Sequence, residues 1–105
     1  YNRHTTISNC VFKWIGDTAM AAWGYTDDTT DNGIRGWDGT AGNFPRWTTI
    51  RNNLVSEIGL WEKQSSAWFQ AKAMQTRLVD NIFFNGPRAG INFNDGFGGG
   101  NAIVG

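Results

Sequence analysis

Short runs of alternating apolar and polar residues, separated by turn residues, follow one another along the chain. In 78–101, for example, Leu78, Ile82, Ile91 and Phe93 stand in short runs that Asn, Asp, Gly and Pro residues separate. Runs of this length favour β-strands, because a helix needs a longer stretch with apolar residues three and four positions apart. The pattern therefore predicts strands joined by tight turns.

The same pattern occurs three times and begins a fourth time. The segments 7–12, 50–55 and 78–83 align with one another, and 102–105 resembles their first residues. Repeats of short strands and turns are typical of solenoids. We therefore predict coil 1 at about 4–24, a loop insertion at 25–47, coil 2 at about 48–72, coil 3 at about 75–101, and the start of coil 4 at 102–105.

The second and third repeats contain a polar pair at the same place, where the first repeat has Asn9, and these residues predict a corner. Asparagine tolerates the left-handed backbone of a tight turn, and stacked side-chain amides can form hydrogen bonds from one coil to the next. Apolar residues at alternate strand positions then fill the interior. The predicted fold is an all-β parallel β-helix, and the predicted ladder residues are Asn9, Asn52, Asn53, Asp80 and Asn81.

An alignment of the repeats on their glycines predicts which residues of the third strand in each coil point inward. When the first and third repeats are aligned on Gly16 and Gly86, Ala21 and Trp23 correspond to the apolar residues of the later repeat. Strand alternation then places these two residues inside and their neighbours outside. The predicted inward residues are Ala21, Trp23, Ile91 and Phe93, and the predicted outward residues are Ala22, Gly24, Asn92 and Asn94.

The repeats resemble those of the right-handed parallel β-helix superfamily, the pectin-lyase-like fold. The resemblance covers essentially the whole chain and is carried by Ile-x-Asn-Asn at 50–53 and Gly-Ile-Asn-Phe-Asn-Asp at 90–95. It implies a three-faced coil, a fold often found in secreted proteins that cut or bind polysaccharides. An extracellular or cell-surface location and a glycan partner are therefore expected from the resemblance. Its motifs specify architecture and not reaction.

Charge and cysteine content narrow the classes of partner. Nine basic residues balance nine acidic residues and are scattered along the sequence, so we expect neither nucleic acid nor a membrane surface as a partner.

Cys10 is the single cysteine and stands in a strand pattern, which favours a buried thiol. The alternative, a nucleophile, would need the only histidine, His4, within hydrogen-bond reach.

The insertion at 25–47 is dense in Asp, Thr, Asn and Gly. Asp28-x-Thr30-x-Asn32-Gly33 resembles the opening of a calcium loop, but Gly39 stands where the bidentate carboxylate is needed. Two interpretations remain: a solvated polar loop without metal or cofactor, which is favoured, and a calcium site. The acidic residues available for such a site are Asp27, Asp28, Asp31 and Asp38.

The aromatic residues of the same region also have two interpretations. Trp37, Phe44 and Trp47 can stack on sugar rings, or they can pin the loop to the coil, and pinning is favoured because aromatic side chains mostly serve packing.

The third repeat offers a candidate binding face. Outward amides between a guanidinium and a carboxylate suit sugar hydroxyls and carboxylates. The candidate residues are Arg88, Asn92, Asn94 and Asp95, with Trp37 from the insertion. The alternative is structural, with a polar ladder and with Asp95 holding the glycine-rich bend by side-chain hydrogen bonds.

Two classes of function follow from the sequence. The first is a non-catalytic module, structural or glycan-binding, whose open ends stack on further coils or on copies of the chain. The second is part of a polysaccharide lyase or glycoside hydrolase, which needs a base with a charge-neutralising partner or two carboxylates. The candidate catalytic residues are Asp17, Glu62, Lys63, Arg88 and Asp95, and no motif selects a pair among them.

Overall fold

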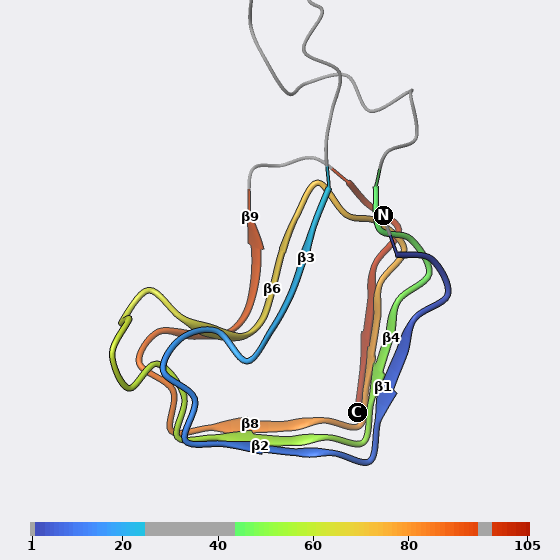
Figure 1. The fold of residues 1–105 in the computed structure, drawn as a ribbon. Helices are drawn as coiled ribbons and strands as arrows, with labels where there is room; N and C mark the ends of the chain where they lie inside the picture. Colours follow the sequence, from blue (N-terminus) through green and yellow to red (C-terminus); the bar gives the residue numbers. More distant parts are fainter. Residues whose placement is uncertain (1, 25–43, 95–97) are drawn as a thin grey trace, which may run out of the picture.

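The structure is a computed structural model that describes residues 2–24, 44–94 and 98–105. These residues form an all-β solenoid in which three strands make up each coil (Figure 1). No helix in the described part of the chain is long and apolar enough to cross a membrane. The described strands are β1 (Thr6–Ser8), β2 (Val11–Lys13), β3 (Met20–Trp23), β4 (Thr49–Arg51), β5 (Leu54–Ser56), β6 (Ser66–Ala71), β7 (Arg77–Val79), β8 (Ile82–Phe84), β9 (Ala89–Asn94) and β10 (Ala102–Val104).

The strands stack into three parallel sheets. The first sheet has the order β1-β4-β7-β10, the second β2-β5-β8, and the third β3-β6-β9. Equivalent residues of successive coils are paired, so that Ile7 lies beside Ile50, Ile50 beside Leu78, and Leu78 beside Ile103. The predicted parallel solenoid, with like residues stacked on like, is therefore confirmed.

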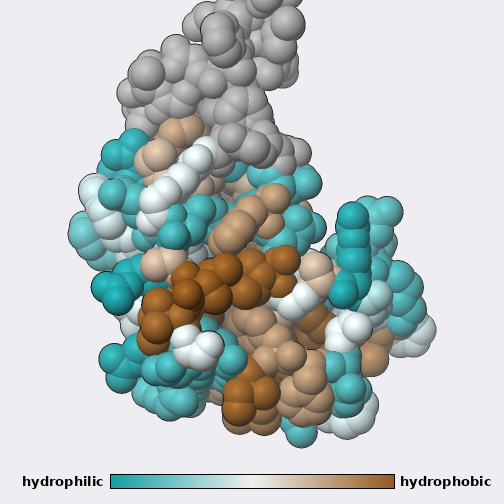
Figure 2. Space-filling model, turned by 180° about the vertical axis from the view of Figure 1, so that it is seen from behind, coloured by the Kyte–Doolittle hydropathy of each residue, from teal (hydrophilic) through white to brown (hydrophobic). Residues whose placement is uncertain are grey.

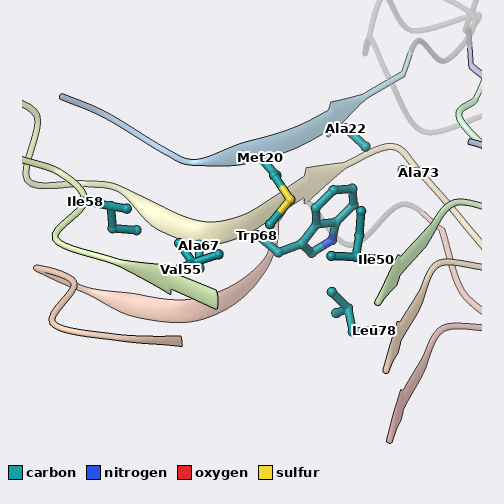
Figure 3. Close-up of a cluster of buried hydrophobic side chains, with 9 residues drawn as sticks. All are labelled: Met20, Ala22, Ile50, Val55, Ile58, Ala67, Trp68, Ala73 and Leu78. Carbon is teal, nitrogen blue, oxygen red and sulfur yellow. The ribbon is translucent and has the colours of Figure 1, made fainter. Parts of the chain in front are cut away.

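The hydrophobic core runs along the axis of the solenoid, between the three sheets (Figure 3). Coil 2 supplies its most buried side chains, among them Ile50, Val55 and Trp68, because coils 1 and 3 cover it from both sides. Ile7, Phe12 and Ile91 occupy interior positions in the outer coils and are only partly buried. Burial therefore depends on the neighbouring coil as well as on the strand pattern.

The corners of the coil are made by left-handed residues at equivalent positions. At the second corner, which lies between the first and second sheets, these are Asn9, Asn52 and Asp80, as the sequence predicts for asparagine-like residues. The other two corners are the leading corner, before the first sheet, and the third corner, between the second and third sheets. Their left-handed residues are His4, Trp47 and Gln75 at the leading corner, and Trp14, Glu57 and Asn85 at the third corner. Tryptophan, glutamate and glutamine seldom adopt this backbone.

The predicted inward and outward residues of β3 are exchanged, because the predicted alignment is wrong by one residue. Met20 and Ala22 are buried, whereas Ala21 and Trp23 face outward, and Met20 pairs with Trp68, which pairs with Ile91. The reason lies at the third corner. The left-handed corner residues there are Trp14 and Asn85, so that Gly86 corresponds to Ile15 and not to Gly16.

The predicted burial of Cys10 is also wrong, because its thiol is exposed. In the next two coils the same position holds Asn53 and Asn81. The thiol of Cys10 lies 3.2 Å from the carbonyl oxygen of Ser8, and its side chain adds no amide to the ladder. Coil 1 is the first of the described coils, so coil 2 is the one described coil that stacks against this position.

Candidate functional site

The outer face of the third sheet carries a pair of stacked aromatic rings. The rings of Trp23 in β3 and Phe69 in β6 have centroids 5.6 Å apart and planes inclined by 26°. Trp23 is 57% exposed, and Phe69 is partly exposed. The pair exists because strand alternation points both residues away from the core, where Met20 and Trp68 occupy the neighbouring inward positions.

Two side-chain amides border this aromatic pair. Asn92 in β9 pairs with Phe69. Asn94 pairs with Ala71, and Ala71 in turn pairs with Trp23. We call Trp23, Phe69, Asn92 and Asn94 the aromatic face. Two of the predicted binding residues, Asn92 and Asn94, therefore belong to it, while Trp37 and Asp95 lie outside the described residues. The sequence prediction missed Trp23 as a member, because it placed that ring inside the coil.

Arg88 lies at the opposite end of β9 from Asn94, at the third corner. It lines a pocket of about 210 Å³ together with Ile58, Phe83 and Gly90. The strand Ala89–Asn94 separates it from the far edge of the aromatic face. Arg88 and Asp17 are in coils 3 and 1, so the 57–66 segment of coil 2 lies between them.

Three further predicted catalytic residues lie at the third corner with Arg88, and each of the three takes part in local turn structure. Asp17 Oδ1 accepts hydrogen bonds from the Thr18 backbone N–H at 2.5 Å and from the Ser65 hydroxyl at 2.9 Å. Glu62 Oε1 accepts from the backbone N–H of Gln64 at 2.8 Å. Lys63 Nζ donates to the carbonyls of Gly59 at 2.8 Å and Leu60 at 3.0 Å. These bonds fix the loop that joins β5 to β6.

The hydrogen bonds to Asp17 also favour its charged form. The backbone N–H of Thr18, followed by the Ser65 hydroxyl, lowers the pKa of the Asp17 carboxyl below its ordinary value. A general acid in glycoside hydrolysis needs a carboxyl whose pKa is raised. Asp17 is therefore suited to hold its turn as a carboxylate and not to donate a proton.

The described residues contain no group of three or more His, Cys, Asp and Glu side chains arranged to hold a metal ion. The candidate calcium residues Asp27, Asp28, Asp31 and Asp38 lie outside the described residues.

The amide ladder occupies the second corner, between the first and second sheets. Asn81 Oδ1 accepts from both the backbone N–H and the side-chain amide of Asn53, each at 3.0 Å, and Asn53 Oδ1 accepts from the Cys10 backbone N–H at 3.0 Å. The same two amides donate to strand carbonyls, Asn53 to Ile7 at 3.0 Å and Asn81 to Ile50 at 2.8 Å. On the outside of this corner, Asn52 donates to Asn9 at 2.6 Å. The predicted asparagine ladder is thus a structural element of the described coils.

The aromatic residues at the end of the predicted insertion belong to the coil stack. Phe44 is buried, and Trp47 stacks on His4 with ring centroids 4.6 Å apart and planes inclined by 14°. Both residues therefore pack against the coil, in agreement with the favoured interpretation. Comparison of the chain with known proteins found no matching family model, no matching curated protein and no matching solved structure.

Proposed function

We propose that this chain is a non-catalytic, extracellular β-solenoid segment that binds glycan on its aromatic face. The observation that carries the proposal is the stacked pair of Trp23 and Phe69 beside the amide of Asn92. The location follows from the resemblance to secreted parallel β-helix proteins.

The chemistry of the aromatic face suits a sugar ring. The C–H groups on one side of a sugar can lie against an aromatic ring, and amides supply both donors and acceptors for the hydroxyls at its rim. The rigid sheet holds ring and amide at fixed places, which lowers the entropy lost on binding. A groove with catalytic carboxylates is not needed for this activity.

The alternative function, a lyase or a hydrolase, has less support in the described residues. Asp17, Glu62 and Lys63 are bound into the third corner, and Asp17 is held as a carboxylate. Trp23 is the last residue of β3, at the end of the strand that is far from the third corner. Among the described residues, the carboxylates and the lysine with catalytic potential therefore do not adjoin the aromatic face.

Replacement of Trp23 by alanine is expected to weaken binding of a neutral polysaccharide by about tenfold or more, since the exposed ring supplies most of the apolar contact. Affinity electrophoresis against a panel of soluble neutral polysaccharides would identify a ligand, and titration calorimetry would then measure the loss. The matched control is Trp61→Ala, because Trp61 is 87% exposed at the third corner, away from the aromatic face.

Equal losses for Trp23→Ala and Trp61→Ala would contradict the proposal, and so would the absence of binding to every polysaccharide of the panel by the folded wild-type chain. Far-UV circular dichroism of each variant would establish that the strands are intact.

A second candidate function, assembly through the ends of the solenoid, is favoured by the apolar end faces. At coil 1 the interior opens as a pocket of about 440 Å³ lined by Ile7, Phe12 and Met20 among others. At the other end, Ile103 occupies an interior position beside Leu78 yet is 59% exposed, and Phe93 is also exposed. Figure 2 shows hydrophobic side chains gathered in a band across the molecule seen from behind. Such faces suit contact with further coils or with copies of the chain.

If copies occupy these faces, Ile103→Asp should raise the dissociation constant for self-association by tenfold or more, because a charge would be buried at the junction. Sedimentation velocity over a range of concentrations would measure this. Val11→Asp is the control, since Val11 lies on the outer face of β2. A wild-type chain that stays monomeric at all concentrations would refute association between copies.

A further inference from the structure

Four arginines that are far apart in the sequence come together on the first sheet and its leading corner. Arg3 and Arg46 lie side by side on successive coils, where they form an isolated parallel bridge. Arg51 ends β4, and Arg77 begins β7. The basic residues look scattered along the chain, but the register of the coils gathers these four.

Arg51 and Arg77 both point away from the core. Ile50 and Leu78 occupy the inward positions of the two strands, so the residues on either side of them face outward. Arg77 pairs with Thr49, and Arg51 is two residues further along the same strand. The two arginines are therefore diagonal neighbours on the outer face of adjacent strands.

The other two arginines flank an aromatic ring at the leading corner. The guanidinium carbons of Arg3 and Arg46 lie 5.8 and 5.9 Å from the ring centroid of Trp47, within the range of cation–π contact. His4 stacks on the same ring. This arrangement holds positive charge beside the row of outward residues on the first sheet.

Charge is unevenly distributed over the described coils. The described residues include eight of the nine basic residues, all except Arg35, and four of the nine acidic residues, so their net charge is 8 − 4 = +4. Of these acidic residues, Asp17, Glu57 and Glu62 lie at or beside the third corner, and Asp80 lies at the second. In the described part of the chain, no carboxylate forms an ion pair with Arg51 or Arg77, and both side chains are exposed.

We propose that the outer face of the first sheet is an anion-binding site for a sulfated polysaccharide, with Arg51 and Arg77 at its centre and Arg3 and Arg46 at its edge. A guanidinium group binds an oxyanion with two parallel hydrogen bonds, and hydroxyl groups such as that of Thr49 complete the contacts. This site is separate from the aromatic face, so it can exist whether or not that face binds glycan.

A sulfated sugar fits this face better than nucleic acid does. Proteins that bind single-stranded nucleic acid stack its bases on open aromatic rings between the cationic groups. Trp47 is the aromatic residue of this surface, and its ring already contacts His4, Arg3 and Arg46. The remaining outward neighbours in the first sheet, such as Thr6 and Thr49, are short side chains that leave room for sugar rings.

The test is heparin affinity of the double variant Arg51→Gln/Arg77→Gln, measured by calorimetry at several salt concentrations. The expected result is a loss of about tenfold or more, with the slope of log affinity against log salt reduced by about 1 to 2. The matched control is Lys13→Gln/Arg88→Gln, which removes the same charge from exposed residues beside the third corner and should change affinity much less. Arg51→Lys/Arg77→Lys should keep the salt slope and lose part of the affinity, because lysine keeps the charge without the paired hydrogen bonds.

Several results would overturn the proposal. One is an equal loss in the two Gln double variants, which would indicate attraction to net charge alone. Another is binding of a DNA oligonucleotide as tight as that of heparin, with the same dependence on Arg51 and Arg77. If the Gln variant does not fold, an unchanged affinity in the Lys variant would likewise count against the site. Trp23→Ala should leave heparin binding unaltered, so failure at the aromatic face and failure here are distinguishable.

Discussion

Replacement of Trp68 by alanine is expected to lower the free energy of unfolding by about 3–5 kcal/mol. Trp68 is 2% exposed and lies at the centre of the core, between Met20 of coil 1 and Ile91 of coil 3. Its indole N–H donates to Gln70 Oε1 at 3.1 Å. The substitution would leave a cavity that spans three coils and an acceptor without its donor.

Urea denaturation followed by far-UV circular dichroism would measure this loss. Trp61→Ala is the control, because that side chain is exposed and should change the free energy of unfolding by about 0.5 kcal/mol or less. If Trp68→Ala were as stable as Trp61→Ala, Trp68 would not pack at the centre of the core as it does in the structure.

Replacement of Asn53 by alanine is the second substitution with a large expected effect, a loss of about 2–4 kcal/mol in the free energy of unfolding. The buried amide of Asn53 bonds to the Ile7 carbonyl, to Asn81 and to the Cys10 backbone N–H, and alanine can replace none of these contacts. Coils 1 and 3 would both lose a partner at the second corner, where polar atoms out of contact with water need one.

Asn92→Ala is the matched control for the ladder, because Asn92 faces outward on the third sheet. The same denaturation experiment should show a change of about 0.5 kcal/mol or less for it. Equal stability of the Asn53→Ala and Asn92→Ala variants would mean that the ladder contributes nothing to the association of the coils. Hydrogen exchange of the Cys10 amide offers a local measurement, since its acceptor is the Asn53 side chain.

The solenoid itself could be predicted from the sequence because its register is repeated there. The pairs Asn52-Asn53 and Asp80-Asn81 mark the same corner in successive coils, and the observed strand pairing follows them. A corner that needs left-handed backbone favours asparagine, so sequence and geometry agree at this place. The first sheet and the ladder were therefore within reach of pattern reasoning.

The inward and outward residues of β3 could not be predicted in the same way, because the third corner carries an asparagine in coil 3 alone, at Asn85. Trp14 and Glu57 hold left-handed backbone there although neither residue type favours it, while the nearby glycines suggested a different alignment. An error of one position exchanges the two faces of a strand. For this reason Trp23 was placed in the core, and the aromatic face was missed until the register was known.

The four arginines of the first sheet and its leading corner come together only when the coils stack, so their grouping could not be seen in the sequence. Arg46 and Arg77 lie on one surface because of the length of coil 2, which decides which residues of successive coils become neighbours. No short sequence pattern indicates that length. Balanced overall charge also conceals an uneven distribution, since net charge says nothing about position. Surface electrostatics of a solenoid must therefore be worked out after its register.

The left-handed corners have a consequence for how such a chain can evolve. Ten of the described residues other than glycine hold this backbone, from His4 to Asn85, at a typical cost of about 1 kcal/mol or more for each. Tryptophan, glutamate and glutamine hold this backbone in the coils as well as asparagine and aspartate, so the corners accept several types of side chain. Each exchange at a corner changes a row of groups spaced about 4.8 Å apart. New surface chemistry can thus arise by mutation at the corners while the interior sequence stays constant.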